Sequence, residues 1–333
     1  MEITLLLSSL ELELQKQVSR LDQPHTKPFH EMITYHMGWT GDGAGPEATG
    51  KRIRPLMVLL CASASGGDWK KALPAAAAVE LVHNFSLVHD DIQDNSPKRR
   101  GRDTVWTKWG APMAINVGDA LFVLSNQAII DLKENHQAET VVKAAEILHN
   151  TCLELTRGQF LDMSYEGRHD LKVEDYWPMI AGKTAALLSA CCHLGALLGG
   201  ADEASQDTYR SFGQYLGFAF QVQDDILGIW GDEAVTGKSA ASDLVEGKNS
   251  MPVLAGLSAN GKFAERWRRG SIIQEEVEEI ASLLAKEGGY QSAHEASKQM
   301  TDLALLNLRE AQPQGEAGDA LFDLAGKLLK REQ

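Results

Sequence analysis

The amino-acid sequence predicts an all-α fold, on two observations. The segments between Gly and Pro residues are long and rich in Ala and Leu, and their apolar residues recur at three- and four-residue spacing. No convincing run alternates apolar and polar residues as a half-buried strand does, and no hairpin signal is present. The helices that this spacing predicts cover Leu73–His89, Ala111–Leu132, Glu139–Gly158, Thr184–Gly199 and Thr208–Ile229.

Gly and Pro residues separate these segments, but none of the stretches between them looks like a long flexible linker. The 333 residues, 44% of them hydrophobic, can bury a large core, and no solenoid-length repeat is visible, so one helical domain over residues 1–333 is expected. Asp175 is the expected N-cap of a helix that includes Trp177 and Pro178. Loops are expected at Gly38–Gly50, Asn95–Asp103, Gly231–Gly237, Gly256–Gly270 and Gln312–Gly318.

The net charge of -14 argues against nucleic acid as a partner, because binding a phosphate backbone requires a basic face. The cations are unevenly spread, however. Seven of the 32 Lys and Arg residues fall in the two short segments 51–54 and 98–102. An acidic protein with such local concentrations of positive charge is a candidate for binding small anionic ligands.

Membrane insertion and secretion are not expected from this sequence. No stretch reaches the roughly 18 to 20 uninterrupted apolar residues of a membrane span. The first residues lack the basic start, long apolar run and cleavage site of a secretory signal, so a cytoplasmic protein without a transmembrane segment is predicted. Buried, reduced thiols are expected at Cys61, Cys152, Cys191 and Cys192, which lie in apolar segments without metal-site spacing.

The strongest local signal is HDDIQD at residues 89–94, which contains the pattern DDxxD. On a helix Asp90 and Asp94 are one turn apart, roughly 40° round the axis, so both carboxylates point the same way. Asp91 flanks that face, and His83 lies two turns earlier on the same stripe.

A second acidic pair, Asp224 and Asp225, ends another apolar helix, and Gln221 lies on the same face one turn earlier. Like charges beside buried segments are costly unless cations compensate them. Carboxylates without His or Cys spacing suit Mg²⁺, which completes its shell with water and substrate phosphate. A solvated helix end would explain either pair alone, but two such pairs favour a site that holds a diphosphate through Mg²⁺.

Basic loops supply the complement to these carboxylates. Lys51 and Arg54 lie in GKRIRP at the mouth of a predicted helix, and Arg99 and Arg100 follow the first acidic motif. Arg gives bidentate contacts to phosphate oxygens, and Lys acts as a compact point charge.

Three further lysines, Lys183, Lys238 and Lys248, stand beside Gly in GKT, TGKS and EGK. Each alone is more often a solvated lysine at a helix end. A P-loop at TGKS is rejected, because the required glycine spacing and the preceding strand are missing. A phosphohydrolase metal site at His89-Asp90 would need further His residues at matching positions, and none can be placed.

Taken together, these motifs resemble those of the trans-isoprenyl diphosphate synthase family, which includes geranylgeranyl and farnesyl diphosphate synthases. The motifs are GKRIRP at 50–55, LVHDDIQDNSPKRRGR at 87–102, GKT at 182–184 and FQVQDDILGIWGD at 220–232, followed by TGKSAASDL and EGK. The resemblance implies the isoprenoid synthase fold, a single large helical bundle around a deep central cavity, as a homodimer. It also implies a prenyltransferase that condenses isopentenyl diphosphate with a dimethylallyl, geranyl or farnesyl diphosphate.

Roles follow from the resemblance by position. Asp90, Asp91 and Asp94 would bind Mg²⁺ and the allylic diphosphate, and Asp224 and Asp225 would bind the remaining Mg²⁺. The isopentenyl diphosphate pocket would contain Lys51, Arg54, His83 and Arg100. The allylic diphosphate would be held by Arg99, Lys183, Lys238 and Lys248. Polar groups near the reacting carbons would be Thr184 and Gln221.

Two positions depart from the family pattern. Gly228 stands where many relatives have a third aspartate, which leaves the second metal site one carboxylate short unless Asp232 assists. Asp103 stands where a proline is common, which is expected to loosen the turn after the arginines.

Product length in the family depends on residues about one turn before the first acidic motif. A bulky residue there closes the channel for the growing chain, and a small one lets it pass. Phe85 followed by Ser86 predicts that the channel closes at an intermediate chain length. This favours the twenty-carbon geranylgeranyl product over farnesyl or slightly longer products.

Two other classes remain as alternatives. A terpene cyclase shares the helical architecture and the DDxxD motif but does not need the isopentenyl pocket of Lys51, Arg54 and His83. A non-catalytic subunit of a heteromeric prenyltransferase would be favoured by loss of an acidic motif, and both motifs are substantially present.

Overall fold

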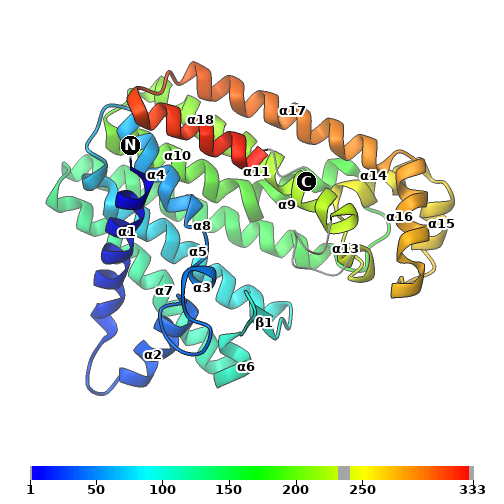
Figure 1. Ribbon diagram of the computed structural model, residues 1–333, viewed down its shortest axis with the longest axis horizontal. Helices are drawn as coiled ribbons and strands as arrows, with labels where there is room; N and C mark the ends of the chain where they lie inside the picture. Colours follow the sequence, from blue (N-terminus) through cyan, green and yellow to red (C-terminus); the bar gives the residue numbers. More distant parts are fainter. Residues whose placement is uncertain (1, 232–240, 330–333) are drawn as a thin grey trace. The chain divides into compact units, whose positions relative to one another are not determined.

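The computed structural model describes residues 2–231 and 241–329. Over these residues the regular secondary structure is helical except for one short ladder between β1 (Lys98–Arg99) and β2 (Arg102–Asp103), so the all-α prediction is confirmed (Figure 1). The helices are α1 Ile3–Val18, α2 Lys27–His36, α3 Pro46–Thr49, α4 Ile53–Ala64, α5 Leu73–Gln93, α6 Val105–Trp109, α7 Ala111–Asp131, α8 Ala138–Tyr165, α9 Val173–Ile180, α10 Ala186–Gly199, α11 Glu203–Trp230, α13 Ser242–Val245, α14 Met251–Ala259, α15 Lys262–Trp267, α16 Val277–Lys286, α17 Gly289–Glu310 and α18 Gly315–Leu329.

The chain divides into two compact units, each discontinuous in sequence. The first contains Met1–His149, Cys191–Gln206 and Pro313–Ala320, and the second contains Asn150–Ala190, Asp207–Gln312 and Leu321–Gln333. Each unit is described by itself below. The organisation as one domain stays a prediction.

Helix α5 is the centre of the first unit and packs against α7, α4 and α1. The run Ala75–Ala78 is fully buried, and these small side chains let neighbouring helices approach closely. A Cβ at Gly118 of α7 would lie 2.2 Å from His89 Nε2, so the glycine lets this ring lie against α7. The tight packing fixes α5, which carries the first acidic motif at its C-terminal end.

The second unit has its own apolar core, built from α9, α11 and α13–α17. Tyr176, Val222, Leu254, Phe263 and Leu284 are buried within it. Helix α11 contributes Val222 and Ile229 to this core and carries the second acidic motif between them. The core therefore fixes the orientation of that motif.

The helices predicted from spacing are confirmed, with ends that differ by a few residues. The prediction of a loop over Gly256–Gly270 is wrong, because α14 ends within this range and α15 lies inside it. Here the glycines are accommodated by packing: a Cβ at Gly256 would meet Leu284 and Phe263. Likewise, α18 begins at Gly315, inside an expected loop, whereas Gly231–Gly237 falls largely outside the described residues.

The expected N-cap is also displaced. Helix α9 begins at Val173, and Asp175 lies in its first turn, where its carboxylate accepts a hydrogen bond of 2.8 Å from the backbone N–H of Lys172. A carboxylate in the first turn satisfies a free N–H group as an N-cap would, which explains the misplacement. All four cysteines are buried free thiols, as expected.

Two helical stretches among the described residues, 111–134 and 173–199, are long and apolar enough to cross a membrane by length and composition alone. In the two stretches 44% and 67% of the apolar window is buried within the protein. Core helices of globular proteins meet the same criterion, so this is weak evidence for a membrane span.

Candidate active site

The end of α5 presents the first acidic motif. The side chain of Asp91 is 3% exposed and forms an ion pair of 2.8 Å with Arg99, whereas that of Asp90 is 24% exposed and lies 3.7 Å from the same guanidinium. Asp94 is exposed at the C-cap of the helix, and its N–H donates to the carbonyl of Asp90. Burial raises the pKa of Asp91, and the bonds from Arg99 oppose that shift. The two carboxylates accessible to a ligand are thus those of Asp90 and Asp94.

Arg99 and Arg100 are carried by a tight turn between β1 and β2. Lys98 pairs with Asp103 and Arg99 with Arg102, so Arg100 and Gly101 are the two turn residues, with φ of 53° and 75°. Two residues with positive φ are what a type I′ hairpin turn requires. The hairpin was not predicted, because each strand is only two residues long and Arg-Gly is a less familiar turn pair than Asn-Gly.

Asp103 does not loosen this turn, contrary to expectation. Its carbonyl accepts a hydrogen bond of 2.9 Å from the hydroxyl of Tyr35. The turn is further closed by Thr104, whose N–H donates to the carbonyl of Pro97 and whose hydroxyl donates to the carbonyl of Ser96. Backbone contacts therefore replace the rigidity that a proline would give.

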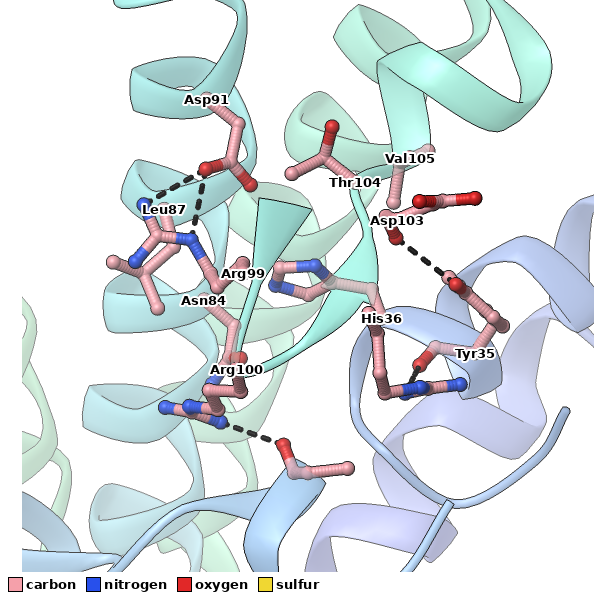
Figure 2. Close-up of a pocket in the computed structure, with 12 residues that line it drawn as sticks. Tyr35, His36, Asn84, Leu87, Asp91, Arg99, Arg100, Asp103, Thr104 and Val105 are labelled. Carbon is pink, nitrogen blue, oxygen red and sulfur yellow. Dashed lines mark hydrogen bonds and ion pairs between the residues drawn. The ribbon is translucent and has the colours of Figure 1, made fainter. Parts of the chain in front are cut away.

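The two basic segments meet in the first unit. Arg100 donates a hydrogen bond of 2.8 Å to the carbonyl of Ala48, and its Nη2 would lie 2.6 Å from a Cβ placed at Gly50 (Figure 2). Gly50 has φ 78° and ψ 177°, a conformation that other residues rarely adopt. The glycine of GKRIRP thus lets a guanidinium from the other segment lie against the backbone beside exposed Lys51.

The cationic cluster of the first unit consists of Lys51, Arg54 and Arg100, with His83 beside Arg54. Nη1 of Arg54 lies 3.3 Å from Nε2 of His83, which accepts its hydrogen bond. Burial, followed by the charges of Arg54 and Arg100, lowers the pKa of His83 well below its ordinary value. The imidazole is therefore neutral and orients Arg54 through its lone pair.

His36 is a residue that no sequence motif identified. It lines a small cavity with Asp91, Arg99 and Arg100 (Figure 2). Burial, followed by the charges of Arg99 and Arg100, lowers its pKa to about 3. An uncharged ring at this place lets several guanidinium groups gather without adding another positive charge.

In the second unit, Lys183 and Thr184 lie in a π-helical turn, Ala181–Ala185, between α9 and α10. A Cβ at Gly158 would lie 2.0 Å from the backbone nitrogen of Lys183, so α8 and this turn touch through glycine. Such bulges are frequent at functional sites, because they redirect side chains. Here Lys183 forms an ion pair with Asp162, a partner that no sequence motif predicted.

Thr184, Gln221 and Asp225 form a chain of hydrogen bonds. The hydroxyl of Thr184 donates to Gln221 Oε1 at 2.7 Å, and Gln221 Nε2 donates to Asp225 Oδ1 at 3.0 Å. Asp225 Oδ2 accepts from the hydroxyl of Tyr176 at 2.7 Å and from the N–H of Met251 at 2.9 Å. The expected proximity of Thr184 and Gln221 is present.

Asp224 and Asp225 differ in environment. Asp225 is 6% exposed, and burial raises its pKa to about 6, while the bonds from Met251, Tyr176 and Gln221 act in the opposite direction. Both carboxylate oxygens of Asp225 already accept hydrogen bonds from the protein, which favours a structural role for this side chain. Asp224 is half-buried and is the better placed of the two for a ligand.

Gly228 has a structural reason to be glycine. A Cβ at this position would lie 2.1 Å from Oδ2 of Asp243, whose side chain is 7% exposed. Lys248 lies 3.3 Å from Oδ1 of Asp243 and 2.7 Å from Glu246. A carboxylate distant in sequence therefore occupies the space beside the position where many relatives have their third aspartate. Lys238 and Asp232 lie outside the described residues.

Comparison with known proteins agrees with these sites. The family model described as polyprenyl synthetase matches residues 45–285. A geranylgeranyl diphosphate synthase of Mycobacterium tuberculosis is 40% identical over 292 residues, which cover 86% of this chain and 83% of that protein. A (2E,6E)-farnesyl diphosphate synthase of Mycobacterium bovis is 37% identical over 330 residues, 96% of this chain and 89% of the relative.

The crystal structure of a polyprenyl synthetase from Streptomyces coelicolor A3(2) matches with a TM-score of 0.87 and 36% identity, covering 98% of this chain and all of that one. The structural match extends far beyond the motifs, so the shared helical fold does not depend on short patterns alone. Together with the family match, it confirms the resemblance drawn from the sequence. The chain belongs to the polyprenyl synthetase family.

Proposed function

We propose that this protein is a prenyltransferase that condenses isopentenyl diphosphate with an allylic diphosphate, head to tail. The observation that carries the proposal is the cationic cluster of the first unit. Arg100 reaches the backbone at Ala48 and Gly50, and Arg54 is oriented by His83. Clustered guanidinium groups suit the bidentate recognition of phosphate oxygens.

The carboxylates suit magnesium by their chemistry. No three His, Cys, Asp or Glu side chains among residues 2–231 and 241–329 form a cluster able to hold a metal ion. Mg²⁺ takes one or two protein carboxylates and completes its shell with water and substrate phosphate. Asp90 and Asp94 in the first unit, and Asp224 in the second, therefore each suit a metal that binds with the diphosphate. Asp91 and Asp225 remain predicted ligands from the family pattern. When bound, the metal would stabilise the charge that builds on the leaving diphosphate.

The cationic residues would bind the two substrates at their diphosphate groups. Arg99 holds the allylic diphosphate while its C–O bond ionises, because fixed positive charge stabilises the departing group. Lys183 remains a predicted ligand of that diphosphate from the family pattern. Lys51, Arg54 and Arg100 hold isopentenyl diphosphate so that its double bond attacks the allylic carbon. The proton lost from the adduct goes to the released diphosphate, and no protein nucleophile is needed.

Product analysis tests this function. The purified protein is incubated with Mg²⁺, isopentenyl diphosphate and, in turn, dimethylallyl, geranyl and farnesyl diphosphate. Elongated diphosphates are the expected result. A hydrocarbon or an alcohol would indicate a terpene cyclase, and no turnover would indicate a non-catalytic subunit. The cationic cluster favours the synthase, because a cyclase has no need to bind isopentenyl diphosphate.

The proposed product is geranylgeranyl diphosphate, with farnesyl diphosphate as the second candidate. Phe85 lies on α5 five residues before Asp90, and its ring contacts Phe122 at 5.2 Å and His89 at 5.4 Å between centroids. Ser86 donates to the carbonyl of His83 and leaves no bulk at its position. These aromatic rings support a floor for the growing chain.

Phe85→Ala is expected to lengthen the product by at least one five-carbon unit. Removing the ring deletes most of the floor and leaves a space that an apolar chain can fill. Mass spectrometry of the products from farnesyl and isopentenyl diphosphate measures the change. An unchanged product distribution in a folded variant would disprove the floor assignment.

A homodimer is proposed as the working assembly. Exposed apolar side chains follow α7, namely Met113 at 44%, Ile115 at 47%, Val123 at 53% and Ile130 at 51% exposure. Several exposed apolar side chains on one helix of a globular protein are typical of an interface. Light scattering of the purified protein should give the mass of two chains, and the mass of one chain would contradict the proposal.

A further inference from the structure

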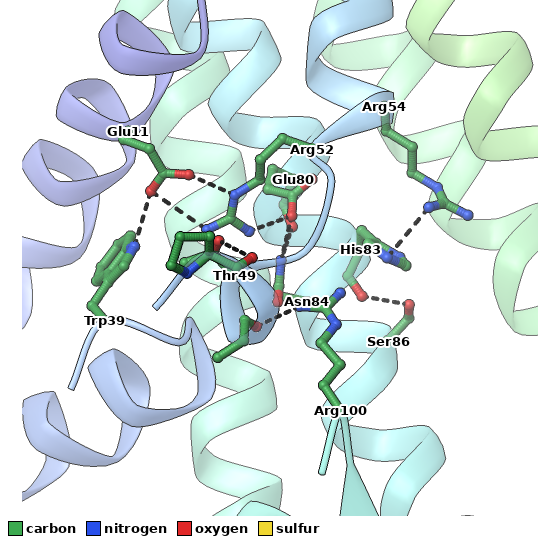
Figure 3. A network of polar contacts seen from close by, with 12 residues as sticks. Glu11, Trp39, Thr49, Arg52, Arg54, Glu80, His83, Asn84, Ser86 and Arg100 are labelled. Carbon is green, nitrogen blue, oxygen red and sulfur yellow. Dashed lines mark hydrogen bonds and ion pairs between the residues drawn. The ribbon is translucent and has the colours of Figure 1, made fainter. Parts of the chain in front are cut away.

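Arg52 stands between two predicted ligand-binding residues but lies in the protein interior. Its side chain is 4% exposed, and Nη1 donates at 2.6 Å to Glu80, which is equally buried (Figure 3). Nε donates at 2.7 Å to Glu11 of α1, which is 28% exposed. The guanidinium therefore joins α1 to α5 and has no free face for a substrate.

The network extends on both sides of this guanidinium. Asn84 donates at 3.0 Å to the same carboxylate of Glu80, and Trp39 donates from Nε1 at 2.9 Å to Glu11 (Figure 3). Two carboxylates face one guanidinium, so both partners of the buried pair are well satisfied. A fully satisfied buried network rigidifies the segments that it connects.

The backbone at Arg52 is strained in a way that the network explains. Arg52 is the N-cap of α4 and has φ 49° and ψ 35°, the left-handed conformation. For a residue with a side chain this conformation is unfavourable, and it persists only where surrounding contacts hold it. The turn sends Arg52 inward, whereas Lys51 is exposed and Arg54 reaches His83.

We propose that Arg52, through Glu80 and Glu11, is a positioning residue that sets Lys51 and Arg54 against Arg100 for binding isopentenyl diphosphate. The assignment rests on the proposed function, because it concerns one of its two substrates. Arg52 does not touch the ligand in this account. Its buried ion pair fixes the conformation of the GKRIRP loop, and the loop presents the cations.

The decisive variant replaces both members of the buried pair, Arg52→Met with Glu80→Leu. Removing one partner leaves a buried charge and destabilises the fold, whereas a hydrophobic pair of similar volume is often neutral. We expect a melting temperature close to that of the wild type. We also expect binding of isopentenyl diphosphate, measured by calorimetry without turnover, to weaken at least about tenfold, because small misplacements of binding groups are costly.

Kinetics with geranyl diphosphate provides the second readout. The KM for isopentenyl diphosphate should rise, while the KM for geranyl diphosphate and kcat at saturation should stay within about twofold, since the allylic site is held by other residues. If the double variant is unstable, Glu80→Gln keeps the shape and an acceptor oxygen while Arg52 stays paired with Glu11, and the same selective rise is expected. Arg52→Lys should restore part of the affinity, because it keeps the charge but not the forked geometry.

A matched control exists in the same unit. Arg20 pairs with Asp131 on α7, away from the basic loop, with 33% and 12% of the side chains exposed. The pair Arg20→Met with Asp131→Leu removes another ion pair of the same unit, more exposed than that of Arg52 and Glu80, and should leave the affinity for isopentenyl diphosphate unchanged. The inference is overturned if a folded Arg52 and Glu80 variant binds this substrate as tightly as the wild type, or if both substrates weaken equally. A wild type that binds isopentenyl diphosphate but never elongates would instead overturn the proposed function alone.

Discussion

Asp90→Asn is expected to lower the rate of elongation by at least about 10²-fold. Loss of one group that stabilises charge in the transition state typically lowers a rate by this factor. Asp90 is the partly exposed carboxylate of the first motif, with 24% of its side chain accessible at the end of α5. An amide of the same shape keeps the packing but loses a negatively charged oxygen ligand. Incorporation of labelled isopentenyl diphosphate into geranyl diphosphate measures the effect.

The same substitution at Asp22 is the matched control for Asp90→Asn. Asp22 follows α1 in the same unit and is exposed. Asp22→Asn should leave elongation within about twofold of the wild type, as exposed substitutions usually do. If Asp90→Asn folds and keeps the wild-type rate over a range of Mg²⁺ concentrations, the role assigned to the first motif is wrong.

Gly50→Ala is expected to raise the KM for isopentenyl diphosphate at least about tenfold, because displaced binding groups lose most of their effect. The new methyl group would lie 2.6 Å from the guanidinium of Arg100, so that side chain would have to leave its place against the loop. The KM for the allylic substrate should change much less. Steady-state kinetics with each substrate varied in turn gives both values.

Gly110→Ala separates this contact from backbone strain. Gly110 has φ 86° and ψ 154°, close to the conformation of Gly50, but its added Cβ would meet only Pro112, at an ordinary 3.7 Å. Both variants should lose stability of about 1–3 kcal/mol from an unfavourable backbone conformation. Equal KM values for isopentenyl diphosphate in the two variants would show that Arg100 is not what Gly50 accommodates.

Much of the fold could be predicted from the sequence because it rests on local patterns. Apolar spacing located α5, α7 and α11 to within a few residues, and the acidic motifs lie at the ends or within the last turns of such helices. The predicted loop at Gly256–Gly270 failed because tertiary packing overrides local propensity: Gly256 is glycine for lack of space beside Leu284 and Phe263.

Several parts of the site that could not be predicted depend on partners distant in the chain. Asp225 looks like a ligand in sequence, but Tyr176 and Met251 donate hydrogen bonds to it in the fold. Arg52 looks like its basic neighbours, and only the position of Glu80 in space makes it structural. Residue type and spacing predict a charge, but burial decides whether that charge meets a ligand or the protein itself.

Head-to-tail condensation is tested by the ratio of diphosphate released to isopentenyl diphosphate incorporated. The purified protein is given geranyl diphosphate and Mg²⁺, with and without labelled isopentenyl diphosphate, and in parallel with a chelator. We expect one diphosphate released for each five-carbon unit added, and no release when isopentenyl diphosphate or Mg²⁺ is withheld. Release of diphosphate from geranyl diphosphate alone, with a hydrocarbon or an alcohol as product, would contradict a head-to-tail condensation.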